Sequence, residues 1–220
     1  MTPARIIRSH RRTVALVITR EGDLLVRAPY RTPEAFIERF IDQKRSWIED
    51  KQAAARARSG AGSGLSFDHG TPFLYRGEPV RLAVSESARE IAVQDGQLIF
   101  PRWFLAAPRR RLTAWYKARA KDEIIRRARE LAQQHGFTPA SIRITGAKSR
   151  WGSCGRGRLN FSWRLMMLLP SMADYVIVHE LAHLSQPDHS PRFWAIVGRI
   201  VPEYKSIHQS IRLYTDRILL

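Results

Sequence analysis

Residues 179–189 read HELAHLSQPDH, a stretch in which three histidines and one glutamate are spaced as metal chemistry requires. On a helix, His179 and His183 lie one turn apart on the same face, so their imidazoles can converge on one ion. Glu180 lies about 100° round the helix from His179, close enough to reach a water on that ion. With His189 as third ligand and one position left open, the set is typical of a catalytic zinc site. The stretch predicts a metal ion and an activated water.

The histidines require a helix that ends near His183 and a turn that returns His189 to it. We expect this helix to begin with Ser171 as its N-cap and Asp174 at the N3 position, a capping arrangement. Pro187 should end it, because proline cannot continue a helix. The chain then turns, and the turn is expected to deliver the third ligand.

Two segments upstream alternate between apolar and polar residues and are predicted to be strands of a small sheet. They are residues 141–145, SIRIT, and residues 159–165, LNFSWRL. In the second segment the large apolar side chains should point to one face and Asn160 to the other. A glycine-rich connection joins the two strands. We expect the metal-binding helix to pack on this sheet.

The rest of the chain favours an α+β fold that is β-rich in its N-terminal part. Residues 13–19 and 23–28 are predicted to form a hairpin, followed by a helix from Pro33 towards Ala55. A Gly/Ser-rich run at residues 59–64 is typical of a linker. Short strands and a long basic helix over residues 109–135 follow. The predicted parts are listed by residue number: an N-terminal hairpin and helix region, 1–58; a linker and β-rich segment, 59–105; and a compact domain, 106–220, whose metal-binding helix packs on a small sheet.

The composition is that of a basic globular protein. Its 37 Lys and Arg residues against 20 Asp and Glu give a formal net charge of +17. Such a charge favours an anionic partner such as a nucleic acid or a nucleotide, although an arginine-rich proteome would produce it as background. Apolar runs are too short for a membrane span, and one cysteine, Cys154, suits a reducing compartment. We therefore expect a cytoplasmic protein without a membrane partner.

Three motifs stand out in the C-terminal half of the chain: KSRWGSC at residues 148–154, DYVIV at residues 174–178 and HELAHLSQPDHSPRFW at residues 179–194. Together they resemble the YgjP-like metallopeptidase family, which is related to the WLM and SprT-like zincins. The resemblance implies a zincin-like domain with Zn²⁺, or another divalent metal, as cofactor. It implies that His179, His183 and His189 are the metal ligands and that Glu180 is the general base.

The spacing of the three histidines also occurs in metzincins, which makes that group an alternative. Metzincins place a glycine where this chain has Gln186, and no downstream Met-turn is evident. The metzincin assignment therefore fails, and a compact zincin similar to the SprT and WLM groups is preferred.

Further residues near the motif are candidates for supporting roles. Asp188 could orient the neighbouring ligand through a hydrogen bond, or cap the helix that follows it. His208 could stabilise an oxyanion, although a lone histidine is more often a surface or core residue. Cys154 is expected to be a buried thiol, since three histidines already complete a catalytic zinc site.

The segment before the second strand contains candidates for substrate binding. Lys148 and Arg150 precede a strand that resembles the cleft-lining edge strand of zincins, to which an extended peptide could add. Two cations near a metal could equally hold phosphate oxygens. Asn160 on the following strand is a further candidate.

These observations predict a metal-dependent hydrolase, with a zinc metallopeptidase as the leading interpretation. Its substrate would be a peptide or protein. The first alternative is hydrolysis of a nucleoside triphosphate at the same metal site. The second is a nucleic-acid-associated protein that binds DNA through its basic surface and cleaves DNA-linked protein. Fold resemblance cannot choose among these substrates.

Overall fold

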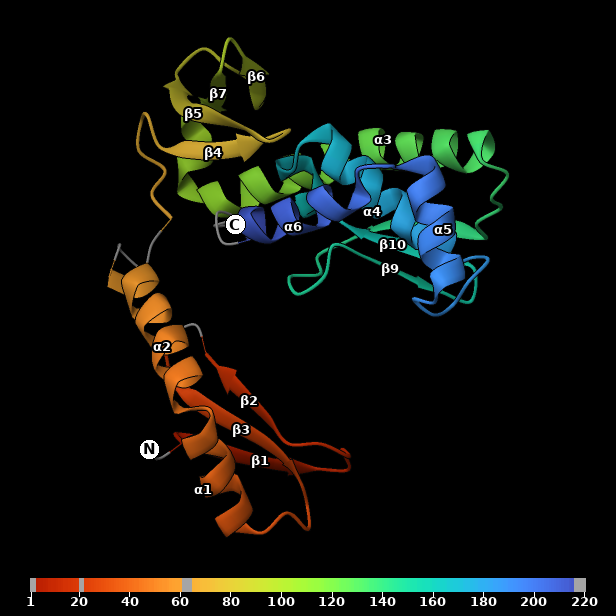
Figure 1. Ribbon diagram of the computed structural model, residues 1–220. Helices are drawn as coiled ribbons and strands as arrows, with labels where there is room; N and C mark the ends of the chain where they lie inside the picture. The colour runs from red at the N-terminus through yellow and green to blue at the C-terminus, as the bar shows by residue number, and fades with distance from the viewer. Residues whose placement is uncertain (1–2, 20–21, 61–64, 216–220) are drawn as a thin grey trace. The chain divides into compact units, whose positions relative to one another are not determined.

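The computed structural model describes residues 3–19, 22–60 and 65–215 (Figure 1). It confirms the predicted α+β class, because the described residues form helices and three small sheets. The chain contacts separate two compact units, Met1–Leu65 and Ser66–Leu220. Among the described helices, none combines the length and apolar character that crossing a membrane requires.

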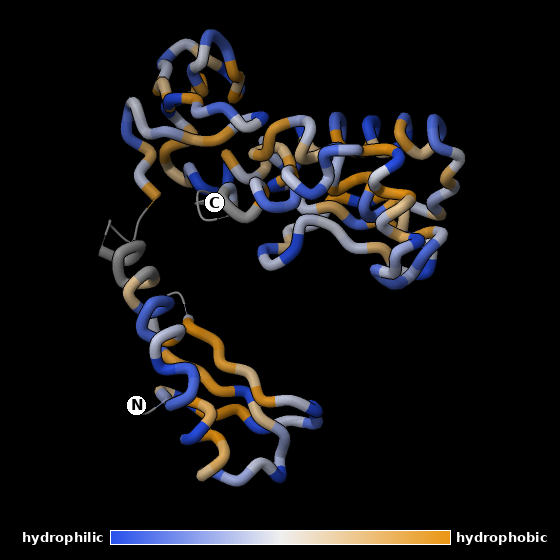
Figure 2. The backbone as a smooth tube through the Cα atoms, viewed as in Figure 1, coloured by the Kyte–Doolittle hydropathy of each residue, from blue (hydrophilic) through white to orange (hydrophobic). Residues whose placement is uncertain are grey.

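The first unit contains a three-stranded sheet covered by helices. The strand β3 (Leu24–Pro29) lies between β1 (Arg5–Ser9), which is parallel to it, and β2 (Ala15–Ile18), which is antiparallel. Hydrophobic residues lie along these strands (Figure 2). The predicted hairpin is therefore confirmed, although Glu21 of its turn lies outside the described residues.

The prediction of one continuous helix over residues 33–55 is wrong. The structure has two helices, α1 (Glu34–Gln43) and α2 (Arg45–Gly60), separated by Lys44. The Lys44 backbone, at φ −107° and ψ 15°, leaves the helical region without a proline or glycine to signal the break. Of the predicted linker at residues 59–64, the first two positions belong to α2 and positions 61–64 lie outside the described residues.

The second unit begins with a four-stranded sheet in the order β4-β5-β7-β6. Its strands are β4 (Pro72–Tyr75), β5 (Glu78–Ser85), β6 (Ala92–Gln94) and β7 (Gln97–Pro101). A short 3₁₀ helix, η1 (Arg102–Ala106), leads into the long helix α3 (Pro108–Gln134). The long basic helix predicted over residues 109–135 is thereby confirmed. The three-part division of the chain stays a prediction.

The sheet that bears on the metal centre has the order β8-β10-β9. Its strand β10 (Arg158–Ser162) is parallel to β8 (Ser141–Thr145) and antiparallel to β9 (Gly152–Gly155). The prediction that the second strand continues to residue 165 is wrong. A 3₁₀ helix, η2 (Trp163–Met167), replaces its end, and all five of its residues are buried. A strand with one solvent-facing side could not bury consecutive residues in this way.

The helix α4 (Pro170–Ala182) carries the first histidine of the motif and runs along β9 and β10 (Figure 1). Its predicted start is wrong by two residues, because Leu169 is the N-cap and Pro170 is the first helical residue. Proline suits that position, since its fixed φ is helical and its missing N–H is not needed there. Two helices follow, α5 (Pro191–Ile200) and α6 (Tyr204–Thr215).

Asp174 does not cap α4 but ties it to α3. Its two carboxylate oxygens accept hydrogen bonds of 2.9 Å from Nε and Nη2 of Arg127. Such a two-bond pair at a half-exposed site is worth about 1 kcal/mol. We therefore expect Asp174→Ala to lower the free energy of unfolding by about that amount.

The matched control is Ser171→Ala, which alters the residue that the sequence had suggested as the cap. Because Ser171 is exposed and is not the N-cap, its replacement should change stability by less than about 0.5 kcal/mol. Urea unfolding of the two variants checks the pair. Equal losses would contradict the assignment of Asp174 to the α3–α4 contact.

Candidate metal centre

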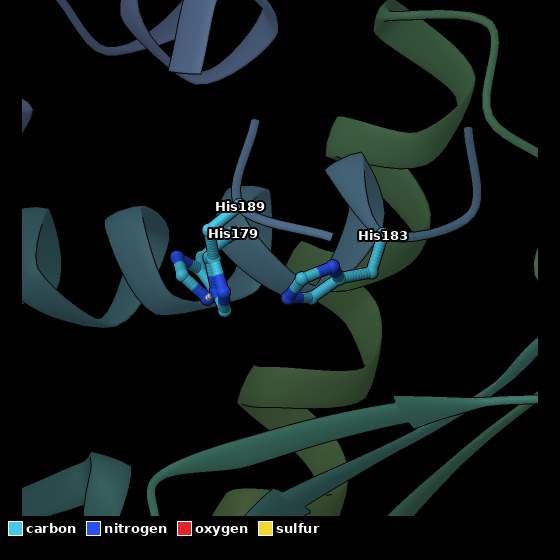
Figure 3. A group of neighbouring side chains, drawn as sticks. All are labelled: His179, His183 and His189. Atoms are coloured by element: carbon cyan, nitrogen blue, oxygen red, sulfur yellow. Dashed lines mark hydrogen bonds between the residues drawn. The ribbon is translucent and has the colours of Figure 1, made fainter. Parts of the chain in front are cut away.

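Three histidines converge at the C-terminal end of α4. His179 lies in its last turn, His183 is its C-cap, and His189 lies in the connection to α5. One ring nitrogen from each lies within 4.8 Å of the others, and the Nε2 atoms of His179 and His189 are 3.1 Å apart. Figure 3 shows the rings pointing toward one another. The three predicted ligands are brought together.

The turn after α4 orients His183 as well as returning the chain. Backbone hydrogen bonds continue the helical turn to Gln186, and Pro187 then stops it. The carbonyl oxygen of Gln186 lies 3.0 Å from Nδ1 of His183. With the proton on Nδ1, this bond leaves Nε2 of His183 with its lone pair free for a metal.

Two aromatic residues of α5 form the wall behind the histidines. The ring of Phe193, which is fully buried, lies 4.5 Å from that of His183 and 4.9 Å from that of His179. The ring of Trp194 stacks on His189 at 5.7 Å. The sequence analysis quoted both residues only as part of the motif at residues 179–194 and gave them no role of their own. The phenylalanine and tryptophan pack against the histidine rings and hold them in place.

The donor set fits a divalent metal ion. Burial, helped by His183, His189 and His208, lowers the pKa of His179 to about 4, so its ring is neutral at neutral pH. A neutral imidazole is the form that binds metal. Nitrogens that share a tetrahedral zinc ion lie about 3.3 Å apart, close to the 3.1 Å between the two Nε2 atoms.

Glu180 is buried beside this cluster, with 7% of its surface exposed. Burial raises the pKa of its carboxyl to about 7, while Arg150 and the backbone amide of Cys154 act in the opposite direction. The carboxylate packs against Gly152 of β9. A Cβ on Gly152 would lie 2.6 Å from Cγ and 2.7 Å from Oε1 of Glu180. The sequence analysis gave Gly152 no role of its own, and its place in the WGSC motif was the available signal.

In the metal-free protein, we expect Glu180→Gln to increase stability near neutral pH. Because the pKa in the folded state is raised from 4.5 to about 7, the stability that the carboxyl contributes is complete below pH 4.5 and is lost as the pH rises through 7. The uncharged amide avoids this loss, which is about 3 kcal/mol at most.

Thermal unfolding after chelation, measured from about pH 4.5 to about pH 8, checks this effect. At the upper end of this pH range, the unfolding temperature of the variant should be several degrees above that of the wild type. At the lower end, the two unfolding temperatures should be equal. Titration of His179 is present in both proteins and cancels in the difference. Parallel curves over the whole range would contradict the buried, proton-binding state of Glu180.

The loop before β9 contains Lys148 and Arg150, the two predicted substrate-binding cations, and hydrogen bonds from residues at the end of β10 and just after it hold it in place. Lys148 and Arg150 are both exposed, and Arg150 is the one whose charge acts on Glu180. The hydroxyl of Ser162 donates a 2.8 Å hydrogen bond to the carbonyl of Ala147, and the buried Arg164 donates to the same carbonyl at 3.3 Å. These bonds fix the loop that leads to Gly152.

The other candidate residues are distributed around the site. The carboxylate of Asp188 accepts a hydrogen bond of 3.3 Å from the backbone N–H of Ser190, at the start of α5. Nδ1 of His208 lies 2.9 Å from the hydroxyl of Tyr175, whose ring is 6.0 Å from that of His179. Asn160 lies on the opposite face of the sheet from Gly152, because its partner in the β9 register is Ser153.

Comparison with known proteins identifies the family of this chain. The sequence profile described as "YgjP-like, metallopeptidase domain" matches residues 12–214. A similar solved structure is the crystal structure of the metallopeptidase zymogen of Pyrococcus abyssi abylysin, with 23% identity and a TM-score of 0.39 over 44% of this chain and 99% of that one. A likeness this weak supports no conclusion about this chain. No curated protein matches it. By the family match, the chain belongs to the YgjP-like metallopeptidases.

Proposed function

We propose that the protein is a zinc-dependent peptidase in which His179, His183 and His189 hold the ion and Glu180 is the general base. The observation that carries the proposal is the position of Glu180, buried beside the three histidines with its pKa raised to about 7. A base with a pKa near the working pH is the most effective one, because it is both available and strong enough.

The residues of the chain divide the chemistry between them. When bound, a divalent cation in such a site polarises the scissile carbonyl and lowers the pKa of a coordinated water towards about 7. Ionised Glu180 accepts a proton from the attacking water. It then donates that proton to the amine nitrogen as the peptide C–N bond breaks. Tyr175, whose hydroxyl is hydrogen-bonded to His208, lies next to His179. Its hydroxyl or the His208 ring would donate a hydrogen bond to the developing oxyanion.

A peptide substrate has a docking edge beside Glu180. The strand β9 is an edge strand, so one side of its backbone is not paired within its sheet. An extended peptide can add to such an edge through main-chain hydrogen bonds. Gly152 places this edge directly against the base. Lys148 and Arg150, in the preceding loop, would favour acidic side chains on the substrate.

The test is a substrate panel with the zinc-loaded protein: a casein-like protein, protein–DNA mixtures and the four nucleoside triphosphates. We expect cleavage of the protein substrate, loss of that cleavage on chelation, and its return with added zinc. His183→Ala should lose both zinc and cleavage. Release of phosphate from a nucleotide without peptide cleavage would contradict the peptidase function and favour the nucleotide alternative.

A further inference from the structure

The sheet β8-β10-β9 has two faces of different character. Leu159 and Phe161 of β10 are fully buried on the face that carries Gly152 and Cys154. The Glu180 side chain of α4 lies on this face, because a Cβ on Gly152 would point at it. Alternate residues must point to the other face. Arg158 and Asn160 are therefore on the face opposite to Glu180, and so is Arg143 of β8, which pairs with Asn160.

A hollow of about 380 Å³ lies on that opposite face. Its lining consists of Arg143, Gly155, Arg156, Arg158 and Asn160. Residues two apart on a strand are about 7 Å apart, and paired residues on neighbouring strands about 5 Å. The guanidinium groups are thus anchored at separate points on two strands and a turn.

The charge of this hollow is not balanced by acidic residues near it in the sequence. Residues 131–173 contain no Asp or Glu. Their Lys and Arg residues are Arg143, Lys148, Arg150, Arg156, Arg158 and Arg164. Within the described part of the chain, the ion pairs lie elsewhere, such as Arg76 with Glu123 and Arg127 with Asp174. The charges of the exposed residues Arg143, Arg156 and Arg158 are therefore available to an anionic ligand.

The turn between β9 and β10 places one of these arginines at an unusual backbone position. Arg156 has φ +50° and is followed by Gly157 at φ +73°. Asn and Gly are the residues that normally occupy both positions of such a two-residue hairpin turn. The turn at Arg76 and Gly77, with φ +53° and +84°, has the same form, so this geometry fixes the backbone of Arg156 beside the hollow that its side chain lines.

We propose that this hollow binds the phosphate groups of a nucleic-acid backbone, at a site separate from the metal centre. Guanidinium groups match phosphate oxygens in pairs of hydrogen bonds, which makes arginine the preferred residue for them. Several anchored charges suit a ligand with repeated phosphates better than a single ion. The lining contains no aromatic ring on which a base could stack, so the contact reads the backbone and not the sequence.

The binding of a labelled oligo-dT strand, measured by fluorescence anisotropy over a series of salt concentrations, tests this site in the full chain. The variant carries Arg143→Gln, Arg156→Gln and Arg158→Gln together. A control with the same loss of charge carries Arg110→Gln, Lys121→Gln and Arg129→Gln, which are exposed on α3. Each phosphate contact to a single strand contributes about 0.7 to the slope of log K against log salt.

We expect the hollow variant to lower that slope by about 2 and to weaken low-salt binding by about tenfold or more, with the control close to the wild type. Equal weakening in both variants would overturn the proposal, because net charge alone would then explain binding. An unchanged hollow variant would overturn it as well. So would release of the strand by inorganic phosphate but not by chloride at equal ionic strength, since the site would then take a free phosphate. Unfolding midpoints confirm that both variants are folded.

Discussion

Replacing Glu180 with glutamine is expected to reduce kcat/KM for peptide hydrolysis by about 10³-fold while leaving the zinc content unchanged. Glutamine has the shape of glutamate but cannot accept a proton from water. The three histidines that would hold the ion are not altered by this change. Metal analysis of the purified variant, beside steady-state kinetics on the same preparation, separates loss of the base from loss of the ion.

Two comparisons sharpen this result. Glu203→Gln, at an exposed glutamate just before α6, should retain activity and excludes a general effect of charge. In the wild type, activity should rise as the pH rises through the pKa of Glu180, because only the ionised carboxylate accepts a proton. A bound cation moves that pKa below the value of about 7 found without metal. Undiminished turnover by zinc-loaded Glu180→Gln would remove Glu180 from the mechanism.

Gly152→Ala is expected to reduce kcat/KM by about 10²-fold, again with zinc retained. The added methyl group would lie 2.6 Å from Cγ of Glu180 and 2.9 Å from its Cδ, closer than carbon atoms approach without displacement. Either the carboxylate or the edge strand β9 must move. A misplacement of about 1 Å is enough to cost two orders of magnitude when a proton must be transferred between aligned atoms.

Gly155→Ala is the matched control for this prediction. It lies at the other end of β9, and a Cβ there would have no heavy atom within 4 Å. Because both changes add one methyl group to the same strand, a difference between them reports the contact with Glu180 and not a loss of chain flexibility. Full activity in Gly152→Ala would show that the carboxylate does not need this close contact.

The parts of the site that could be predicted from the sequence are those that depend on one local element. His179 and His183 lie one turn apart because the helix has 3.6 residues per turn. The predicted end at Pro187 is wrong by a few residues, because α4 ends at Ala182 and only turn hydrogen bonds continue to Gln186. The structure accordingly brings both histidines together with His189. The sequence was less informative about boundaries. Ser171 has the chemistry of a cap, but Pro170 takes the first helical position and moves the start of α4.

Other boundaries depended on contacts that no local pattern records. The alternation after Leu159 reads as a longer strand, yet β10 ends at Ser162, because the following residues enter the core on every side. Asp174 forms its hydrogen bonds with Arg127 on another helix. Asp174 could either cap its own helix or pair with a residue of another helix. Its neighbours in space decide between these roles, and the sequence alone does not identify those neighbours.

By itself, then, the sequence determined the chemistry: three imidazoles and a carboxylate at spacings that one helix and one turn bring together. Only the tertiary structure decided how strong a base that carboxylate is. The pKa of Glu180 is raised by burial, and this burial depends on Gly152 and the edge strand β9, which come from a distant segment. The same holds for the two faces of the sheet, one against Glu180 and the other lined by arginines. The periodicity of the sequence determines which side chains share a face. The pKa of a side chain on that face depends on its burial and on the charges around it, which are set by the segments that cover the face.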